Sequence, residues 1–301
     1  MKTYRSAAGS RCLMDSLNIT KIQKPENRNL IFISAGDCET FAKYASMHLT
    51  GYFDLAVFYY GGNERKAKDL SDASTIFAAG VGTKFNSLKC MHEKIPGLLH
   101  SYETVWVCDD DLVPVKGNFI DVPDILNRFH LKVISPAQSL KGKISHQIMV
   151  QLPGEHIFRY VNFVEMGWPL FRSDALAGFL DIYDGSLSGY GIDWWFMNHF
   201  DARNQLVAGI VDQVVFLNPH EARKKGGIRE LDLYMDNGDQ MRQWNQTKKR
   251  NNLLEWERKN LYRVFPDRVE RTRKWSTYLM IRISRIYFFI KRMLTRRSAR
   301  N

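Results

Sequence analysis

The sequence has few cysteines and no long apolar run, and both absences narrow its class. Its four cysteines, among 301 residues, lie far apart and form no C-x-x-C pair, a usage that fits a reducing intracellular compartment. Residues 1–30 lack the apolar run of a signal peptide, and no stretch of about 18 uncharged apolar residues follows. Internal repeats and low-complexity tracts are also missing. We therefore expect a cytoplasmic protein that is neither secreted nor membrane-spanning.

The composition is that of a globular protein, with 45% hydrophobic and 13% aromatic residues. The net charge of +11 is uneven, because residues 241–301 hold 18 basic and 4 acidic residues and so carry +14, which leaves −3 for the rest. A basic extension on a nearly neutral body indicates an anionic partner surface, either membrane or nucleic acid. Zinc spacing, a helix-turn-helix pattern and an RNA-recognition signature are all missing, so we expect no nucleic-acid partner.

The basic extension includes a segment, 275–294, with apolar residues at helical spacing and arginines elsewhere on the wheel. Charge interrupts it too often for it to span a bilayer. A helix of this kind can lie in the membrane interface, attracted by anionic lipid. The prediction is a peripheral attachment of region 275–301 to the inner face of the membrane; packing on the main domain or on a partner is the alternative.

Strand and helix patterns alternate along the first half of the chain. Short apolar strands are expected at 30–34, 54–60 and 104–108, with helices over 39–49 and 83–99. This spacing predicts an α/β fold, with a mixed, mainly parallel sheet flanked by helices and ligands beyond the carboxyl ends of its strands. Segments 146–152 and 157–164 are expected to form a hairpin around Pro153 and Gly154. We expect a poorly ordered lead-in over 1–28, a catalytic domain over 29–240 and a basic helical extension over 241–301.

Three consecutive carboxylates, Asp109, Asp110 and Asp111, follow the apolar strand at 104–108. Like charges this close repel one another unless something neutralises them, and a divalent cation is the usual solution. Side chains alternate in extended chain, so Asp109 and Asp111 point to one side and Asp110 to the other. The pattern predicts that Asp109 and Asp111 ligate Mn²⁺ or Mg²⁺, which would bridge a diphosphate.

Two other interpretations of the triplet stay open at this point. An acidic triplet can be a solvated turn, although its place directly after a buried strand argues against that. Asp109, Asp111 and Val113 also match the D-x-D-x-V pattern of phosphatases, in which the first aspartate is the nucleophile. Composition and periodicity alone lead to a phosphate-binding α/β protein with a metal site.

The order of motifs between about residues 83 and 220 resembles the domain-of-unknown-function 707 family, whose sequences look like glycosyltransferases of the A-type (GT-A) fold. The residues that carry the resemblance are Thr83 and Lys84, VCDDDL at 107–112, ISPA at 134–137, His146, FVEM at 163–166, GYGID at 189–193, IVD at 210–212, and His220. The family usually has W-D-E-D where this chain has CDDD at 108–111, and G-W-V-E-M where it has NFVEM at 162–166. The resemblance implies the A-type fold and a nucleotide-sugar donor bound at a DXD motif.

Basic and acidic residues near the triplet have predicted roles in donor binding. Asp109 and Asp110 are expected at the nucleotide sugar. Lys84, at the start of a helix, is a candidate for the diphosphate because helix N-termini favour anions, with Lys89 as a second candidate; a solvated lysine is the alternative for both. Glu165 interrupts an apolar stretch, so its carboxylate needs a partner or a function, and the resemblance suggests contact with the sugar or with an acceptor hydroxyl.

Residues further along the chain complete the predicted site. Asp193 follows two glycines and precedes Trp194, an aromatic residue that could stack on a sugar ring. An inverting transfer needs a carboxylate at the acceptor hydroxyl, and Asp193 is the preferred general base; a helix N-cap with core tryptophans is the alternative. The resemblance implies His220 as a third metal ligand; a structural histidine is the alternative. Asp212, inside the strand pattern before His220, is expected to be either an orienting partner or a direct contact.

The sequence therefore predicts a metal-dependent glycosyltransferase that transfers a sugar from a nucleotide-sugar donor to a glycan or glycolipid acceptor, as in polysaccharide biosynthesis. The alternatives are a phosphatase with Asp109 as nucleophile and a catalytically silent, membrane-attached binding protein.

Overall fold

The structure is a computed structural model that describes residues 17–38, 40–187, 189–219 and 237–272. The strands are β1 (Asn18–Ile22), β2 (Asn29–Ala35), β3 (Phe53–Tyr59), β4 (Ile76–Ala79), β5 (Thr104–Asp109), β6 (Val113–Lys116), β7 (Val133–Gln138), β8 (Phe158–Val161), β9 (Leu170–Arg172), β10 (Ala208–Leu217), β11 (Asn260–Val264) and β12 (Val269–Arg271). The α-helices are α2 (Thr40–His48), α3 (Glu64–Ala73), α4 (Lys84–Lys94), α5 (Val122–Arg128), α6 (Ser173–Ile182), α7 (Ile192–His199) and α8 (Asn237–Arg250). Short 3₁₀ turns, η1 (Leu99–Ser101), η2 (Phe119–Asp121) and η3 (Gln147–Met149), lie between them.

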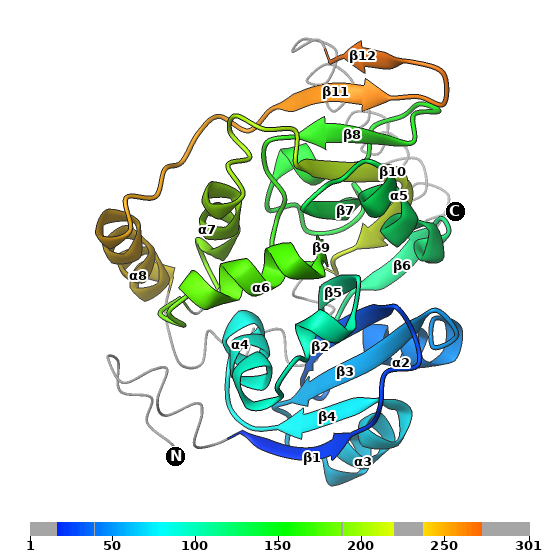
Figure 1. Cartoon of the computed structure of the whole chain (residues 1–301), viewed down its shortest axis with the longest axis vertical. Helices are drawn as coiled ribbons and strands as arrows, with labels where there is room; N and C mark the ends of the chain where they lie inside the picture. The colour runs from blue at the N-terminus through cyan, green and yellow to red at the C-terminus, as the bar shows by residue number, and fades with distance from the viewer. Residues whose placement is uncertain (1–16, 39, 188, 220–236, 273–301) are drawn as a thin grey trace, which may run out of the picture.

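The described strands form one sheet that runs along the long axis of the molecule (Figure 1). Its order is β1-β4-β3-β2-β5-β9-β7-β10-β8-β11-β12, with β6 paired to β10. Strands β4, β3, β2 and β5 are parallel neighbours, as are β7 and β10. The antiparallel β9 joins these two parallel groups, because it pairs with β5 on one side and with β7 on the other.

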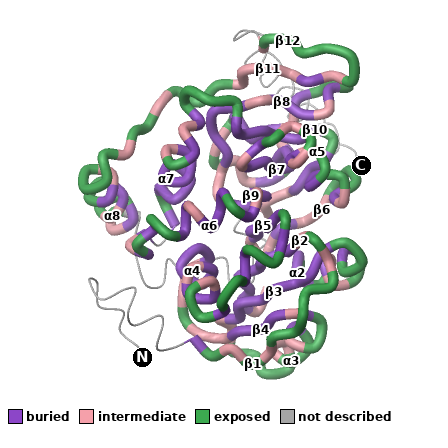
Figure 2. Tube along the Cα trace, viewed as in Figure 1, coloured by how far each residue is buried: buried purple, intermediate pink, exposed green. Residues whose placement is uncertain are grey.

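Helices cover both faces of the sheet because the central strands are apolar on both faces. Along β5, Val105 and Val107 face one core, whereas Trp106 and Cys108 face the other, as the alternation of a strand requires. Helices α4, α6 and α7 bury residues in the first core, and α2, α3 and α5 bury residues in the second. Figure 2 shows the buried trace through β3 and α7 and the exposed trace of β12.

The predicted α/β class is confirmed: the sheet is mixed, its central strands are parallel, and helices flank it. The predicted hairpin around Pro153 and Gly154 is wrong. Strand β8 pairs with β10 and β11, whereas the segment before Pro153 forms the short turn η3. Strand β8 thus pairs with segments about 50 and 100 residues further along the chain instead of forming the predicted local hairpin.

The ends of the expected domain differ from the observed elements. Part of the lead-in forms β1, which pairs with β4. The expected boundary at residue 240 falls inside α8, and β11 and β12 extend the sheet beyond β8. Residues 241–272 therefore belong to the body of the protein, because their strands supply hydrogen bonds that the edge strand β8 would otherwise lack.

The membrane prediction concerns residues 275–301, which lie outside the described residues. Among the helices that the structure does describe, none combines the length and the apolar character needed to cross a bilayer.

Candidate functional site

Asp109 ends β5 at the carboxyl edge of the parallel strands and pairs with Lys84, the first residue of α4. The Lys84 Nζ atom lies 2.8 Å from Asp109 Oδ1 and also donates to the carbonyl oxygens of Met166, at 2.5 Å, and Gly167, at 2.9 Å. A lysine ammonium has three donors, and all three are used here. Lys84 is buried, while the Asp109 side chain stays 41% exposed. Lys84 therefore orients Asp109, and its predicted contact with a diphosphate stays a prediction.

The other two carboxylates of the triplet lie in the turn after β5. Asp110 is buried, and its Oδ2 accepts a 2.7 Å hydrogen bond from the backbone N–H of Gly36 after β2. The Asp110 carbonyl accepts from the N–H of Phe41 in α2. Asp111 is partly exposed. Asp110 thus ties the β2–α2 loop to the end of β5, and Asp109 and Asp110 point toward different partners.

Glu165 brings a further carboxylate to the same edge of the sheet. Its Oε2 atom is buried and has no hydrogen-bond partner among the described residues, although the residue as a whole is partly exposed. Burial raises the pKa of Glu165, and the charges of Asp193 and Asp109 raise it further, while His146 and a hydrogen bond with Ser145 oppose the shift. These charges place Glu165 within electrostatic reach of both aspartates.

Asp193 lies in the first turn of α7 and is buried. Its Oδ1 accepts a 2.8 Å hydrogen bond from the backbone N–H of Trp194, and its Oδ2 lies 3.6 Å from His146 Nε2. Asp193 therefore has one oxygen fixed by the helix and the other directed toward an imidazole. Such an arrangement suits a carboxylate that accepts a proton.

The start of α7 depends on Gly191, whose φ of +92° is left-handed. A Cβ atom at this position would lie 2.2 Å from Cε3 of Trp244 in α8. Glycine is therefore required both for the backbone conformation and for the close contact. The same contact sets the position of Asp193, two residues further on.

Trp194 belongs to an aromatic cluster beside Asp193 rather than to an open surface. Its side chain is 3% exposed, and its ring centre lies 4.7 Å from that of Phe163 and 5.1 Å from that of Trp256. The guanidinium carbon of Arg258 lies 4.8 Å from the Trp194 ring centre. Stacking of a sugar on Trp194, as predicted, would require one of these neighbours to move.

Three other predicted residues lie apart from this cluster or outside the described residues. Lys89 contacts the Leu180 carbonyl at 3.0 Å and Glu93 at 2.7 Å. Asp212 is a buried residue of β10, the neighbour of β8, and its Oδ2 contacts His156 Nε2 at 2.7 Å and Arg159 Nε at 2.8 Å. His220 lies outside the described residues. The predicted role of Asp212, as an orienting partner or a direct contact, stays a prediction.

The outer carboxylates of the triplet fit a divalent cation that is shared with a diphosphate. Mg²⁺ is commonly held by one or two carboxylates, substrate phosphates and water rather than by a cage of protein ligands. Asp109 and Asp111 are both partly exposed oxygen donors at the end of β5. Within the described ranges, no three His, Cys, Asp or Glu side chains are grouped to hold a metal ion. Asp109 and Asp111 are thus the described residues that would hold such a cation.

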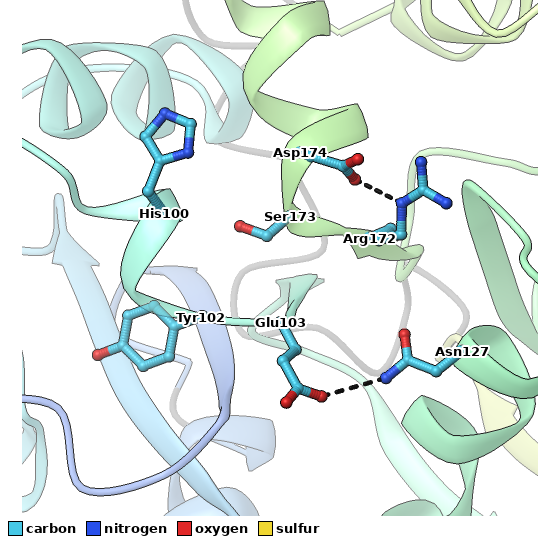
Figure 3. A pocket seen from close by; sticks show the side chains of 7 residues that line it. All are labelled: His100, Tyr102, Glu103, Asn127, Arg172, Ser173 and Asp174. Carbon is cyan, nitrogen blue, oxygen red and sulfur yellow. Dashed lines mark hydrogen bonds and ion pairs between the residues drawn. The ribbon is translucent and has the colours of Figure 1, made fainter.

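A cavity of about 540 Å³ lies at the opposite end of β5 (Figure 3). Glu103 and Tyr102, which line it, precede β5, and Arg172 and Ser173 lie at the end of its antiparallel neighbour β9. Its charged groups are largely paired, since Arg172 contacts Asp174 and Glu103 contacts Asn127. This cavity is separate from the cluster of Asp109, Glu165 and Asp193.

Comparison with known proteins finds similarity in fold only. No protein-family model and no curated protein sequence matches the chain. GalNAc-T7, solved with UDP, GalNAc and Mn²⁺, superimposes with a TM-score of 0.52 at 7% identity, over 73% of this chain and 48% of that one. TarS from S. aureus gives 0.45 at 11% identity, over 64% and 36%, and A197 from STIV gives 0.36 at 14% identity, over 62% and 83%.

The chain therefore has an A-type glycosyltransferase fold, as the resemblance implied. It spans about half of the length of GalNAc-T7. The more specific resemblance to the domain-of-unknown-function 707 family stays a prediction.

Sequence reasoning did not assign a role to His146 or Arg258, and it assigned none to Phe163 beyond its place in a motif. Each acts through a partner far along the chain: His146 faces Asp193, and Arg258 faces Phe163. The only available signal was the position of His146 and Phe163 within the resemblance. No pattern in the sequence marks Arg258.

Proposed function

We propose that the protein is a glycosyltransferase that uses a nucleotide-sugar donor, a divalent cation and a glycan or glycolipid acceptor. The observation that carries the proposal is the partly exposed carboxylate of Asp109 at the carboxyl edge of the parallel strands, held by Lys84 and joined to the segment after Glu165, because the Asp109 N–H donates to the Gly167 carbonyl at 3.1 Å. The charges of Asp109 and Asp193 both raise the pKa of Glu165, although 28 to 84 residues of chain separate the three. Ligands of open parallel sheets bind at this edge.

Asp193 is proposed as the general base. Its Oδ2 is the oxygen proposed to accept the proton, because Oδ1 already accepts a hydrogen bond from the N–H of Trp194. In an inverting transfer, Asp193 takes the proton of the acceptor hydroxyl as that oxygen attacks the anomeric carbon. His146, 3.6 Å from Oδ2, restricts where the carboxylate can point. A product of retained configuration would remove this role.

Glu165 is proposed to bind a sugar hydroxyl between Asp109 and Asp193. Its raised pKa favours the protonated form, and a protonated carboxyl can donate a hydrogen bond as well as accept one. The buried Oε2 without a partner is an acceptor that a ligand hydroxyl could satisfy.

Asp109 and Asp111 are proposed to hold Mn²⁺ or Mg²⁺ together with the diphosphate, with His220 as a possible addition from the sequence. The bound ion supplies positive charge that stabilises the diphosphate as it leaves. Lys84 keeps the Asp109 carboxylate in place through Oδ1, and Asp110 keeps the neighbouring β2–α2 loop against β5. Donor binding therefore depends on Lys84 and Asp110 even without a direct contact between these residues and the donor.

The test is the thermal unfolding of the full chain with Mn²⁺ or Mg²⁺ against UDP, GDP, CDP and ADP. A ligand that binds only the folded state raises the melting temperature, on the order of 5 °C at saturating concentrations. We expect one nucleotide to stabilise the protein, in a manner that chelation with EDTA abolishes. Asp111→Ala should lose the shift, whereas Asp69→Ala, an exposed aspartate on α3, should keep it.

The alternatives give different results in the same experiment. A silent binding protein shows no shift with any nucleotide. A phosphatase that uses Asp109 as nucleophile hydrolyses a phosphomonoester and stops when Asp109 becomes Asn, without any preference for a nucleotide base.

A further inference from the structure

The segment between α8 and β11 holds one arginine, Arg258, against the aromatic cluster beside Asp193. This segment has no regular secondary structure, but Asn162 fixes it on both sides of Arg258. Asn162 Nδ2 donates to the Glu257 carbonyl at 2.9 Å, and Asn162 Oδ1 accepts from the Lys259 N–H at 2.6 Å. Trp256 Nε1 also donates to the Asn162 carbonyl at 3.0 Å. The backbone of Arg258 is therefore held in place.

The guanidinium of Arg258 lies over two aromatic rings. Its carbon is 4.6 Å from the ring centre of Phe163 and 4.8 Å from that of Trp194, within the range of cation–π attraction. The residue is exposed. Within the part of the chain that the structure describes, no hydrogen bond or ion pair occupies its five N–H donors. The two rings thus hold the guanidinium of Arg258 by its flat face, and its N–H groups remain open to solvent.

The charges near Arg258 are arranged around Tyr190, which is exposed. Burial raises the pKa of Tyr190, the charges of Glu255 and Asp193 raise it further, and Arg258 and Lys248 oppose the shift. Lys248 is already paired with Glu255 at 2.9 Å. Among the described residues, the Arg258 guanidinium has no such carboxylate partner and keeps its N–H donors for a ligand.

We propose that Arg258 binds an anionic group of the acceptor, a phosphate or a carboxylate, and so places an acceptor hydroxyl at Asp193. This inference rests on the proposed function. A guanidinium matches both groups in a bidentate manner. Arg258 would act as a specificity residue, because an acceptor without the anionic group would leave this contact unmade.

The position of Arg258 favours the acceptor over the donor diphosphate as the source of that group. The proposed diphosphate position lies at Asp109, at the end of β5. Asp109 pairs there with Lys84 of α4. Arg258 is joined instead to the proposed base: its guanidinium lies over Phe163, the Phe163 ring centre lies 4.9 Å from that of His146, and His146 Nε2 lies 3.6 Å from Asp193 Oδ2. Arg258 thus belongs to the contacts around the base.

The experiment titrates methyl phosphate and, separately, acetate into the full chain and follows tryptophan fluorescence, because Trp194 and Trp256 contact the Arg258 region. We expect saturable binding of at least one of the two anions, weakened at least about tenfold in Arg258→Gln and less in Arg258→Lys, which keeps the charge but loses the bidentate geometry. The matched control is Arg128→Gln. Arg128 is also exposed and stacks on a ring, that of Phe129 at 5.3 Å.

A second measurement separates the possible sources of the anion. The thermal shift given by a nucleoside diphosphate with Mn²⁺ should be the same in Arg258→Gln as in the unmodified chain. Loss of that shift would make Arg258 part of the donor site and overturn the proposal. Equal anion binding in Arg258→Gln and in the Arg128→Gln control would reduce Arg258 to a packing residue and overturn it as well.

The two proposals can fail separately. Arg258-dependent binding of methyl phosphate or acetate, in a chain that binds no nucleotide, would support the anion site and refute the sugar-transfer function. Nucleotide binding without any Arg258-dependent anion binding would do the reverse.

Discussion

Two aspartates of this sheet, Asp109 and Asp212, are each paired with basic side chains but differ in what surrounds them. Asp212 is 2% exposed, and its oxygens contact His156, Arg159 and the N–H of Leu152. Asp109 shares one oxygen with Lys84 and remains 41% exposed. The comparison shows that an acidic residue beside a basic one does not define a role by itself. A carboxylate that is buried with its basic partner stabilises the fold, whereas a carboxylate that stays partly exposed can also contact a ligand.

The neighbours of the two aspartates strengthen this contrast. Arg159 of β8 also donates to the Val150 carbonyl at 2.9 Å and contacts Asn260 of β11, so the cluster around Asp212 joins several segments. Beside Asp109, the Oε2 atom of Glu165 is buried without a partner among the described residues.

Replacement of Asp193 by Asn should lower kcat by about 10²–10⁴-fold, because an amide cannot act as a general base. The asparagine side-chain oxygen can still accept from the Trp194 N–H, so the free energy of unfolding should change little. Steady-state product formation and urea unfolding measure the two quantities. Unchanged kcat would remove Asp193 from the chemistry.

Replacement of Asp212 by Ala should lower the free energy of unfolding by about 3–5 kcal/mol, because Arg159 would be left as a buried charge without its partner. Urea unfolding measures this loss. Affinity for the donor nucleotide, determined without denaturant, should stay within about twofold of the unmodified value. A loss of stability below about 1 kcal/mol, with weakened nucleotide binding, would reverse the roles that we assign to Asp212 and Asp109.

Replacement of Gly191 by Ala should lower the free energy of unfolding by about 1–3 kcal/mol, because the new Cβ meets Trp244 and the φ angle is left-handed. It should also lower kcat, since the start of α7 carries Asp193. Gly51→Ala is the control, because nothing lies within 4 Å of its added Cβ and its φ is not in the positive range. Equal stability of the two variants, measured by thermal unfolding, would contradict this account of α7.

Replacement of Glu165 by Gln should change how stability depends on pH. Burial raises the pKa of Glu165 in the folded protein, so between its unfolded pKa and this higher value the folded state binds more protons, and the free energy of unfolding falls as pH rises. Gln does not titrate, so the fall as pH rises above the ordinary pKa value of 4.5 should be smaller in the variant. Identical pH profiles from urea unfolding would show that the carboxyl is not held in its protonated form.

The sequence predicts those parts of the site that depend on local pattern. The buried strand before Asp109 places the triplet at a carboxyl edge, and the glycines before Asp193 mark a tight start of a helix. It does not predict the partners of Lys84, because the carbonyl oxygens of Met166 and Gly167 come from a segment more than 80 residues away. The sequence does not predict the order of the strands for the same reason, since β8 has its partners in β10 and β11.

The dependence of Arg159 on β11 has a practical consequence for shortened versions of the protein. A chain that stops before residue 260 would remove Asn260 from Arg159 and expose the edge of β8. It would also leave the segment between α8 and β11 connected to the rest of the chain only through α8. Deletion of the basic tail should therefore start after residue 272. An earlier stop would mix any effect of the tail with the loss of the folded body.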